Sequence, residues 1–476
     1  MRGSFQKRTK VVATVGPASR DPQILREMFR SGVNVVRLNF SHGTHDEHRA
    51  VIEDVRRTAR ELDLHIAILQ DLPGPKVRTG PLNGSPSVRL ENGAPFTLTT
   101  RQEPGSAACV SVSYRELPRD VEAGKSIYLQ DGAIALRIDE VTADEVRTHV
   151  EVGGDLRPTQ GINYPDGSLG IESVTERDFE HLAFGLEMDL DWIGVSFVRT
   201  PEDVLRVKSF IKEGGADAPV MAKIEKHEAL EHIDEIIDVA DGIMVARGDL
   251  GIEIPLEQVP LIQKDLIERA NRASKPVVTA TQMLESMITS ARPTRAEAND
   301  VANAILDGTD AVMLSGETAR GKYPLEAVKV MATIACEVEK NYPHDEMKAR
   351  RLEHHDRSTA TAIAQAAALC TEELALRSVI TGTTTGNTAR HISAFRPRAN
   401  IYAITPKLEV ARRLAVVWGV EALMIQSYKT FETMLELAEA RLLSSNLGEV
   451  GELVAFTSGM PVGEGGTNVL KLHRLE

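Results

Sequence analysis

Two carboxylates and a lysine follow neighbouring apolar runs in the middle of the chain. Lys223 and Glu225 end the run VMAKIE, and Asp249 follows the run GIMVARG. Lys223 lies two positions before Glu225, so on a strand both side chains point to the same face. Mg²⁺ in proteins typically takes one or two carboxylates together with waters and substrate oxygens. Glu225 and Asp249 therefore predict a site for Mg²⁺, or for Mn²⁺ in its place, with a cation beside it.

Side chains that bind anions follow other apolar runs. Arg37 and Arg78 carry the fork-shaped guanidinium group that suits phosphate. Arg37 also opens a polar stretch that includes Asn39, Ser41 and His42. An anionic reactant beside a metal ion is typical of phosphoryl transfer or of enolate chemistry.

The turn GDLG at 248–251 could hold a carboxylate through its backbone N–H groups if a helix begins there.

A structural explanation of the same residues is weaker. Helix caps and salt bridges would account for one or two of the polar positions. Polar residues, however, end six of the eight apolar runs described below, and burying them is costly unless they are used or paired.

The elements that must position these residues alternate between strands and helices. Fully apolar strands that alternate with helices indicate a parallel sheet, and eight such units fit a closed (β/α)₈ barrel. A doubly wound open sheet is the alternative. The expected strands are Lys10–Gly16, Val33–Phe40, Ile66–Leu72, Trp192–Val198, Val220–Glu225, Gly242–Arg247, Pro276–Ala280 and Ala311–Ser315. The first expected helix begins near Asp21. The others cover 44–62, 175–188, 202–212, 229–240, 260–273, 295–306 and 324–340.

Two further domains are expected beside the barrel. The barrel would comprise residues 1–72 and 171–345, interrupted by a small β domain at 73–170 that is rich in Gly and Pro and has short alternating segments. After a charged linker at 343–357, a C-terminal α/β domain would cover 346–476.

Composition excludes several classes of protein. The chain has 55 Lys and Arg against 69 Asp and Glu, a formal net charge of −14, so binding to nucleic acid or to an anionic membrane is not expected. Its three cysteines are too few and too widely spaced for a disulfide framework or a CxxC metal site. Without a signal-like segment or a long apolar run, the expected location is cytoplasmic.

Six long motifs, in order, resemble pyruvate kinase across essentially the whole chain. They are RLNFSHG at 37–43, AKIE at 222–225, DGIMVARGDLG at 241–251, ATQMLESM at 280–287, RPTRAEANDVANA at 292–304 and LSGETARGKYP at 314–324. The resemblance implies the transfer of a phosphoryl group from phosphoenolpyruvate to ADP, giving pyruvate and ATP. It also implies a homotetramer.

The resemblance assigns roles that agree with the chemistry of the residues. Glu225 and Asp249 would bind Mg²⁺, and Lys223 would stabilise the phosphoryl group in transfer and the enolate left behind. Arg37 would hold the substrate phosphate. The amides of Gly248 and Asp249 would hold the carboxylate. Thr281 would lie where carbon 3 is protonated. The implied nucleotide-binding residues are Asn39, Phe40, Ser41, His42 and Arg78.

Two positions depart from the common pattern of the family. Leu72 and Lys76 stand where a Thr and a Glu usually help to bind K⁺, and they resemble a branch in which the lysine ammonium replaces the ion. K⁺ is therefore not expected to be required. Gln160 stands where the inserted domain usually has a basic residue that contacts nucleotide phosphate, which makes that contact doubtful.

The tract Thr381–Thr388, between a predicted strand and a predicted helix, could hold a phosphate by its hydroxyls and the helix N-terminus. In the family the corresponding loop binds a phosphorylated allosteric effector, with a later loop that resembles 459–468; an ordinary turn is the alternative. The candidate effector residues are Thr383, Thr384, Thr385, Gly386, Asn387 and Thr388.

Two rival functions remain from the sequence. One is a Mg²⁺-dependent barrel lyase or aldolase of 2-oxoacids, and the other is a non-catalytic sensor of sugar phosphates. The inserted domain and the RLNFSHG run speak against the first. The complete set of predicted site residues speaks against the second.

Overall fold

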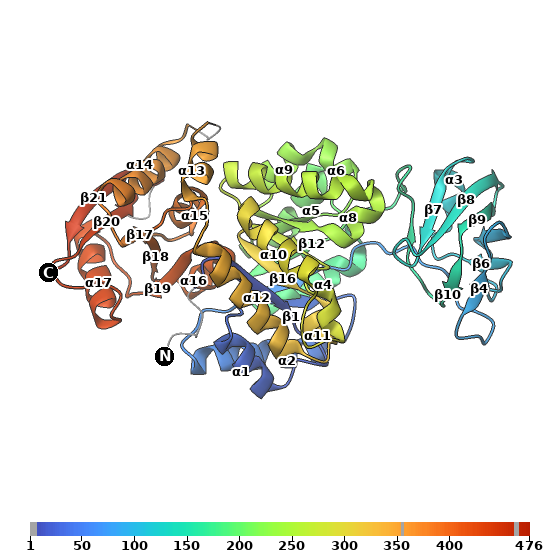
Figure 1. Ribbon diagram of the computed structural model, residues 1–476, viewed down its shortest axis with the longest axis horizontal. Coiled ribbons are helices and arrows are strands. Elements are labelled where there is room, and N and C mark those ends of the chain that lie inside the picture. The colour runs from blue at the N-terminus through green and yellow to red at the C-terminus, as the bar shows by residue number, and fades with distance from the viewer. Residues whose placement is uncertain (1–6, 354–356, 461–465) are drawn as a thin grey trace.

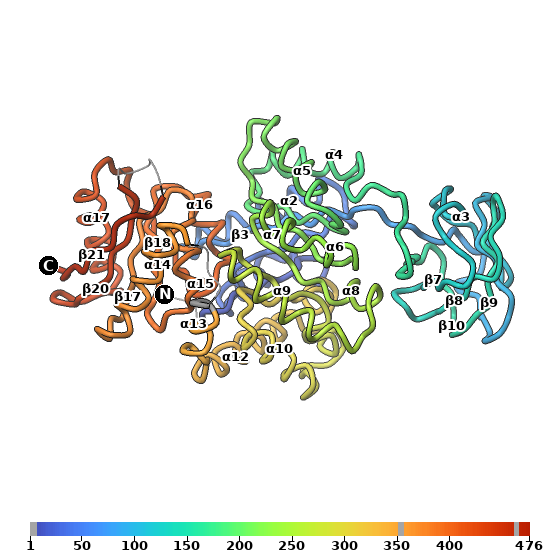
Figure 2. The backbone as a smooth tube through the Cα atoms, turned by 90° about the horizontal axis from the view of Figure 1, so that it is seen from above, coloured from blue at the N-terminus to red at the C-terminus, as the bar shows by residue number. Residues whose placement is uncertain are grey.

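The structure is a computed structural model that describes residues 7–353, 357–460 and 466–476. Three bodies follow one another along its longest axis (Figure 1). The central body contains the barrel, a β domain lies at one end, and an α/β domain that contains the C-terminus lies at the other. Figure 2, at right angles to the first view, shows the same order.

The central sheet is a closed parallel barrel of eight strands, in the order β1-β16-β15-β14-β13-β12-β3-β2. This confirms the predicted barrel and excludes the open doubly wound sheet. Seven of the eight strands are buried at every position or nearly so, because helices cover the outside and side chains fill the inside. The strands are β1 (Lys10–Thr14), β2 (Val35–Asn39), β3 (Ala67–Asp71), β12 (Trp192–Val195), β13 (Val220–Ile224), β14 (Gly242–Ala246), β15 (Val277–Ala280) and β16 (Ala311–Leu314).

Capping residues define where several barrel helices begin. Asp21 accepts hydrogen bonds from the backbone N–H groups of Gln23 and Ile24, and Thr44 and Thr294 form capping boxes with the glutamates three residues later. The main helices are α1 (Pro22–Arg30), α2 (His45–Glu61), α4 (Glu176–Glu187), α5 (Pro201–Glu213), α9 (Val259–Arg272), α10 (Arg295–Asp307) and α12 (Pro324–Glu339). The single helix expected over 229–240 is instead two, α6 (Glu228–Glu231) and α7 (Ile233–Val239), because the chain leaves helical geometry at His232.

The inserted domain leaves the barrel after β3 and returns before α4. Its main sheet has the order β11-β7-β8-β9-β5-β6, and β10 pairs with β4 beside it. Phe96, Leu98, Ile127, Leu136 and Val146 are among the buried residues of its own hydrophobic core. The strands are β4 (Val88–Leu90), β5 (Pro95–Thr99), β6 (Cys109–Ser111), β7 (Ser126–Leu129), β8 (Ile134–Val141), β9 (Glu145–Val152), β10 (Gly154–Leu156) and β11 (Ile162–Asn163), with one helix, α3 (Leu117–Asp120).

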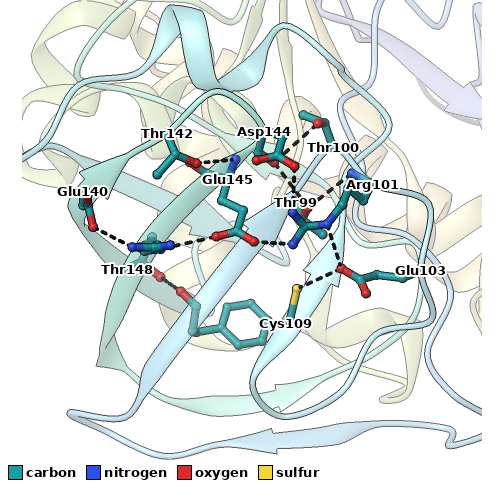
Figure 3. Close-up of polar contacts among 12 residues, drawn as sticks. Thr99, Thr100, Arg101, Glu103, Cys109, Glu140, Thr142, Asp144, Glu145 and Thr148 are labelled. Atoms are coloured by element: carbon teal, nitrogen blue, oxygen red, sulfur yellow. Dashed lines mark hydrogen bonds and ion pairs between the residues drawn. The ribbon is translucent and has the colours of Figure 1, made fainter.

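A network of charged side chains holds one corner of this sheet (Figure 3). Arg101, just after β5, contacts Asp144 at 2.7 Å and also pairs with Glu145 at the start of β9. Glu145 is shared with Arg147, which reaches Glu140 on β8 at 2.8 Å. These pairs face solvent, where each contributes at most about 1 kcal/mol, so the apolar core rather than this network stabilises the domain.

The C-terminal domain has a five-stranded sheet in the order β19-β18-β17-β20-β21. Only β21 is antiparallel to its neighbour, and the other neighbours pair in parallel. The strands are β17 (Ser378–Gly382), β18 (Asn400–Thr405), β19 (Val420–Met424), β20 (Leu453–Ser458) and β21 (Val469–Arg474). The helices are α14 (Thr359–Glu373), α15 (Asn387–Ala394), α16 (Leu408–Arg413) and α17 (Phe431–Ser444).

Much of the expected charged linker is helical. Residues 344–353 of the predicted linker form helix α13 (His344–Glu353). His344 explains part of this, because its side chain is buried and its Nδ1 lies 2.7 Å from the carbonyl oxygen of Arg396 in the C-terminal domain. A side chain fixed between domains makes the segment a structural element rather than a spacer. Within the described residues, no helix is long and apolar enough to cross a membrane.

Candidate active site

Asp71 connects the charged residues at the carboxyl ends of the barrel strands. Its Oδ2 accepts a hydrogen bond from Nε of Arg37 at 2.6 Å, and its Oδ1 accepts one from Nζ of Lys223 at 2.9 Å. Nζ of Lys223 also lies 2.9 Å from Oε1 of Glu225 and donates to Oγ of Ser196 at 2.7 Å. The barrel therefore brings together residues from β2, β3 and β13 that are far apart in the sequence.

These contacts fix the charge of the cluster. Burial alone would raise the pKa of Asp71, but Lys223 and Arg37 outweigh burial and lower that pKa to about 2. Burial would lower the pKa of Lys223, but Asp71 and Glu225 outweigh it and the pKa is raised. Near neutral pH the site therefore holds a carboxylate and an ammonium, both shielded from water.

The buried carboxylate of Glu225 and the half-buried carboxylate of Asp249 act on one another. The pKa of Asp249 is raised to about 7, first by burial and then by repulsion from Glu225, while Lys223 and Lys76 act in the opposite direction. Glu225 is held in place because its Oε2 accepts a hydrogen bond from the backbone N–H of Phe197 at 2.8 Å. Two adjacent oxygen ligands whose charges repel one another suit a hard divalent cation, so the donor set fits Mg²⁺.

A short helix, α8 (Arg247–Glu253), begins at the turn after β14, which meets the condition set for the GDLG turn. Arg247 fixes this turn to neighbouring elements by contacting Oδ1 of Asp300 and the carbonyl oxygen of Thr281, at 2.7 and 2.8 Å. The backbone N–H of Gly248 donates to Oγ1 of Thr281 at 2.7 Å. In this arrangement the Gly248 amide already has an acceptor, so it would bind a carboxylate only by exchanging that partner.

Thr281 lies at a strained position of the backbone. Its φ is 67°, and that of Gln282 is 53°, in the left-handed region that is costly for residues with a side chain. Two such residues in succession turn the chain sharply at the end of β15, so that the hydroxyl of Thr281 faces Gly248. Such strain persists only where the surrounding contacts enforce it, and it is typical of functional sites.

The predicted nucleotide-binding stretch divides into exposed and buried residues. The Asn39 side chain accepts a hydrogen bond from the backbone N–H of Ser41 at 3.0 Å, which shapes the turn. Phe40 is only 1% exposed and stacks on His48, with ring centroids 4.0 Å apart. The ring of Phe40 therefore belongs to the hydrophobic core and supports the turn from behind.

A cluster of positive charge surrounds His42 at the same turn. The pKa of His42 is lowered, first by burial and then by Lys76, Arg78, Arg37 and Arg320. Arg78 is held at the root of the inserted domain, where its Nη1 donates to the carbonyl oxygen of Thr159 at 2.8 Å. The imidazole is therefore neutral, and the positive charges of the four surrounding side chains suit the binding of a polyphosphate.

Lys76 lies directly after the sharp turn Pro73-Gly74-Pro75 that leads into the inserted domain. Gly74 has a φ of +63°, and its backbone N–H donates to Asp178 at 3.0 Å. The pKa of Lys76 is lowered, first by burial of its ammonium and then by Arg78, whereas Asp249 and Asp71 favour its charge. The Lys76 ammonium therefore lies within electrostatic reach of Asp71 and Asp249.

Four contributors were missed from the sequence. Ser196 binds Lys223, Phe197 binds Glu225, Thr14 accepts a hydrogen bond from Arg37 at 2.9 Å, and Arg320 faces His42. Ser196 ends an apolar strand and Arg320 belongs to a quoted motif, so both carried a signal. Phe197 acts through its backbone, at a φ of 54°, and no side-chain pattern reveals that.

A second group of possible metal ligands lies beside the site. His227, Glu228 and Glu253 place ligand atoms within 4.8 Å of one another. Lys226 already lies 2.7 Å from Glu253, and Oγ of Ser168, in the loop after β11 of the inserted domain, donates to Glu228 at 2.5 Å. These partners make the group a contact between the inserted domain and the barrel.

Two hydroxyl groups of the candidate effector loop already have hydrogen-bond partners within the protein. Oγ1 of Thr383 accepts a hydrogen bond from the backbone N–H of Gly386 at 2.8 Å, and Oγ1 of Thr388 lies 2.6 Å from Oγ1 of Thr467. Thr384 is half-buried and Thr385 is exposed, just before α15 begins. Half of the later loop expected at 459–468, residues 461–465, lies outside the described residues.

Comparisons with known proteins agree with this geometry. Residues 6–328 match the family model described as pyruvate kinase, barrel domain, and residues 361–473 match that described as pyruvate kinase, alpha/beta domain. The chain is 44% identical over 475 residues to pyruvate kinase 2 of Synechocystis sp., covering 98% of this chain and 79% of that protein. It is 42% identical over 470 residues to a pyruvate kinase of Staphylococcus aureus, covering 98% and 80%.

A solved structure agrees as well. The crystal structure of a pyruvate kinase from Cryptosporidium parvum superimposes with a TM-score of 0.94 at 36% identity, covering 99% of this chain and 97% of that chain. The match therefore extends from the barrel through the inserted domain to the C-terminal sheet. The chain belongs to the pyruvate kinase family of phosphotransferases.

Proposed function

We propose that the barrel site transfers the phosphoryl group of phosphoenolpyruvate to ADP, through the residues named above. The observation that carries this proposal is the position of Lys223. Its ammonium is held between Asp71 and Glu225, at 2.9 Å from each, and is shielded from water. A fixed, buried cation beside a carboxylate pair is what the charge of a phosphoryl group in transfer and of an enolate requires.

Arg37 binds the substrate phosphate in this proposal, because Asp71 and Thr14 hold its guanidinium group in place. The phosphoryl group leaves the enol oxygen for a terminal oxygen of ADP, and Lys223 stays beside it during the transfer. The enolate then accepts a proton at carbon 3 and becomes pyruvate. Mg²⁺ held by Glu225 and Asp249 would supply positive charge to the carboxylate and enol oxygens of the substrate.

The substrate carboxylate faces the first turn of α8. Gly248 and Asp249 offer backbone N–H groups there, and the Gly248 amide would exchange the hydroxyl of Thr281 for the carboxylate. The freed Thr281 hydroxyl can then orient the water or proton donor at carbon 3.

ADP lies on the side of the inserted domain. Asn39, Ser41, His42 and Arg78 would contact the nucleotide, and Phe40 would support the turn. Gln160 does not replace the missing basic residue, because its Nε2 donates to the carbonyl oxygen of Pro158 at 2.8 Å within its own turn. Closure of the inserted domain would exclude water, which would otherwise hydrolyse the transferred group.

A single assay separates this function from its two rivals. Pyruvate formation from phosphoenolpyruvate is followed by a coupled enzyme, with Mg²⁺ and with or without ADP. We expect formation that depends on both Mg²⁺ and ADP. Pyruvate formed without ADP would indicate lyase chemistry, and no pyruvate under either condition would indicate a sensor.

We propose further that Lys76 replaces K⁺. Its ammonium lies within electrostatic reach of Asp71 and Asp249, and the buried side chain of Leu72 has no oxygen that could bind an ion. Turnover is compared in potassium chloride and tetramethylammonium chloride at matched ionic strength, and we expect equal values. Lys76→Glu should lose activity without K⁺ and regain part of it with K⁺. Tenfold or greater activation of the unmodified chain by K⁺ would contradict the proposal.

The loop Thr381–Thr388 is proposed to bind a phosphorylated effector through Thr384, Thr385 and the first amides of α15. Thr384→Glu places a like charge there, so it should change the affinity for phosphoenolpyruvate without changing the maximal rate. The absence of a response to sugar phosphates and to AMP in the unmodified protein would end this proposal. The homotetramer implied by the family is also a proposal, and sedimentation of the full chain measures it.

A further inference from the structure

A small cavity of about 170 Å³ lies at the seam between the barrel and the C-terminal domain. Its walls come from the last turns of α2, the loop that leads into β3, and α16 of the C-terminal domain. Figure 2 shows α16 beside this side of the barrel, near β3 and α2. Neither the phosphoryl-transfer site nor the loop Thr381–Thr388 contributes a residue to it.

Arg412 is the principal cation of this cavity. Its side chain is 14% exposed, and its one side-chain contact within the described residues is to Oδ2 of Asp189, at a long 3.4 Å. A guanidinium group has five N–H donors, and burying a cation is costly unless it is paired. The charged form of Arg412 is disfavoured here, because its pKa is lowered first by burial and then by Arg56.

Arg56 adds positive charge but is already satisfied. Its Nη1 lies 2.9 Å from Oδ2 of the buried Asp191, and its Nη2 donates to the carbonyl oxygen of Asp189 at 2.9 Å. Arg60 and His65 also line the cavity, and their side chains make no hydrogen bond or ion pair within the described part of the chain. Arg56 therefore contributes positive charge only, whereas the side chains of Arg412, Arg60 and His65 have N–H groups that can donate hydrogen bonds to a ligand.

A further cation approaches from α17. The Nε of Arg441 is buried and has no hydrogen-bond partner among the described residues. The pKa of His65 is lowered, first by burial and then by Arg412 and Arg441, although Asp63 opposes the shift. The acidic groups near the cavity are fewer. The buried Asp191 also acts on Arg412, but it is already paired with Arg56. Asp63 stands at the rim in solvent, and the Asp189 side chain is 78% exposed. The cavity thus has an excess of positive charge that the protein does not neutralise.

We propose that this seam cavity binds a phosphate group, either as free phosphate or as part of a phosphate monoester. Guanidinium groups match the oxygens of phosphate with two parallel hydrogen bonds, and several of them converge here. The cavity is smaller than the 300–1,000 Å³ of typical drug-sized sites, so the remainder of an ester would extend into solvent. Arg60 belongs to the barrel and Arg412 to the C-terminal domain, so the ligand would join the two.

The two tryptophans of the chain provide a local reporter. Nε1 of Trp192 donates to the carbonyl oxygen of Arg413 at 3.0 Å, next to Arg412, and Trp418 is buried at the same seam. The full-length protein is titrated with inorganic phosphate, against chloride at matched ionic strength, while tryptophan fluorescence is recorded. We expect a saturable change that chloride does not produce.

Variants test whether the change arises in the cavity. Arg412→Gln and Arg60→Gln should each raise the dissociation constant at least tenfold, because each removes a charge-assisted contact. Arg57→Gln is the matched control, because Arg57 lies on the same helix but is exposed and pairs with Asp54. It should leave the constant unchanged. If Arg412→Gln does not fold, the exposed Arg60→Gln carries the test.

The other anion sites are excluded in the same experiment. Thr384→Glu and Arg37→Gln disable the C-terminal loop and the barrel site, and the fluorescence change should survive both. Glucose 6-phosphate is compared with phosphate: tighter binding of the ester identifies a metabolite, and tighter binding of phosphate identifies the free ion. Unchanged binding in Arg60→Gln, or loss of the fluorescence change in Arg37→Gln, would overturn the proposal.

Discussion

Asp71 illustrates what a single residue does in this site. It is 2% exposed, it touches both Arg37 and Lys223, and it has no direct role in binding substrate in our proposal. Its function is to hold the cations of Arg37 on β2 and Lys223 on β13 in fixed positions. Positions fixed before the reaction avoid the cost of reorganising charges during it.

Lys223→Met should lower turnover by a factor of about 10²–10³, the usual effect of removing one preorganised charge or hydrogen-bond donor. The affinity for phosphoenolpyruvate should change much less, because Arg37 and the first turn of α8 remain. Steady-state kinetics of the variant measures both quantities, and circular dichroism checks the fold. A loss below tenfold in a folded variant would show that Lys223 does not have the assigned role.

At the scale of the element, sharp turns place the catalytic groups at the ends of straight strands. The turn at Gly74 follows β3 and packs against Phe197, which follows β12 and holds Glu225 through its backbone. The start of the inserted domain is thus in contact with a residue that orients a predicted metal ligand. A change in this turn should therefore appear in metal binding as well as in stability.

Gly74→Ala tests this contact. A Cβ at Gly74 would lie 2.7 Å from Cδ2 of Phe197, in addition to the cost of about 1 kcal/mol for an alanine in the left-handed region. We expect Phe197 to shift and the concentration of Mg²⁺ needed for half-maximal activity to rise several-fold.

Gly84→Ala is the matched control for this variant. Gly84 has a similar φ of +71°, but no atom lies within 4 Å of the added Cβ. It should lower the unfolding temperature slightly and leave the Mg²⁺ requirement unchanged. Equal Mg²⁺ requirements in the two variants would mean that the contact with Phe197 does not position Glu225.

At the scale of the whole molecule, a buried ion pair joins the barrel to the C-terminal domain. Nη1 of Arg396 lies 3.1 Å from Oδ1 of Asp310, just before β16, and its Nη2 donates to the carbonyl oxygen of Gly308 at 2.6 Å. Asp310 also accepts a hydrogen bond from the backbone N–H of Trp418 at 2.9 Å. The side chains of the pair are 1% and 5% exposed, so water cannot replace a lost partner.

Arg396→Met should destabilise the protein by about 3 kcal/mol or more, because it leaves Asp310 buried with an unpaired charge. Arg398→Met removes an arginine two residues later whose pair with Asp345 is exposed, and it should cost at most about 1 kcal/mol. Urea unfolding monitored by tryptophan fluorescence compares the two. Similar losses would contradict the special role of the buried pair.

Much of the fold was accessible from the sequence by itself. Apolar runs separated by capped helices determine a parallel barrel, because each strand is covered on both sides and each helix begins at a recognisable residue. The same logic placed Lys223, Glu225 and Asp249 at strand ends. Side-chain chemistry and spacing are local properties, so they can be recognised without a structure.

The tertiary structure decided what depends on contacts between distant segments. It assigned Phe40 to the core, used the backbone N–H of Phe197 to hold Glu225, and made a helix of the supposed linker. It also gathered Arg60, Arg412 and Arg441 around one seam, although they come from three separate helices. The physical reason is that burial and hydrogen bonding depend on which segments come into contact, and the order of residues along the chain does not reveal those contacts.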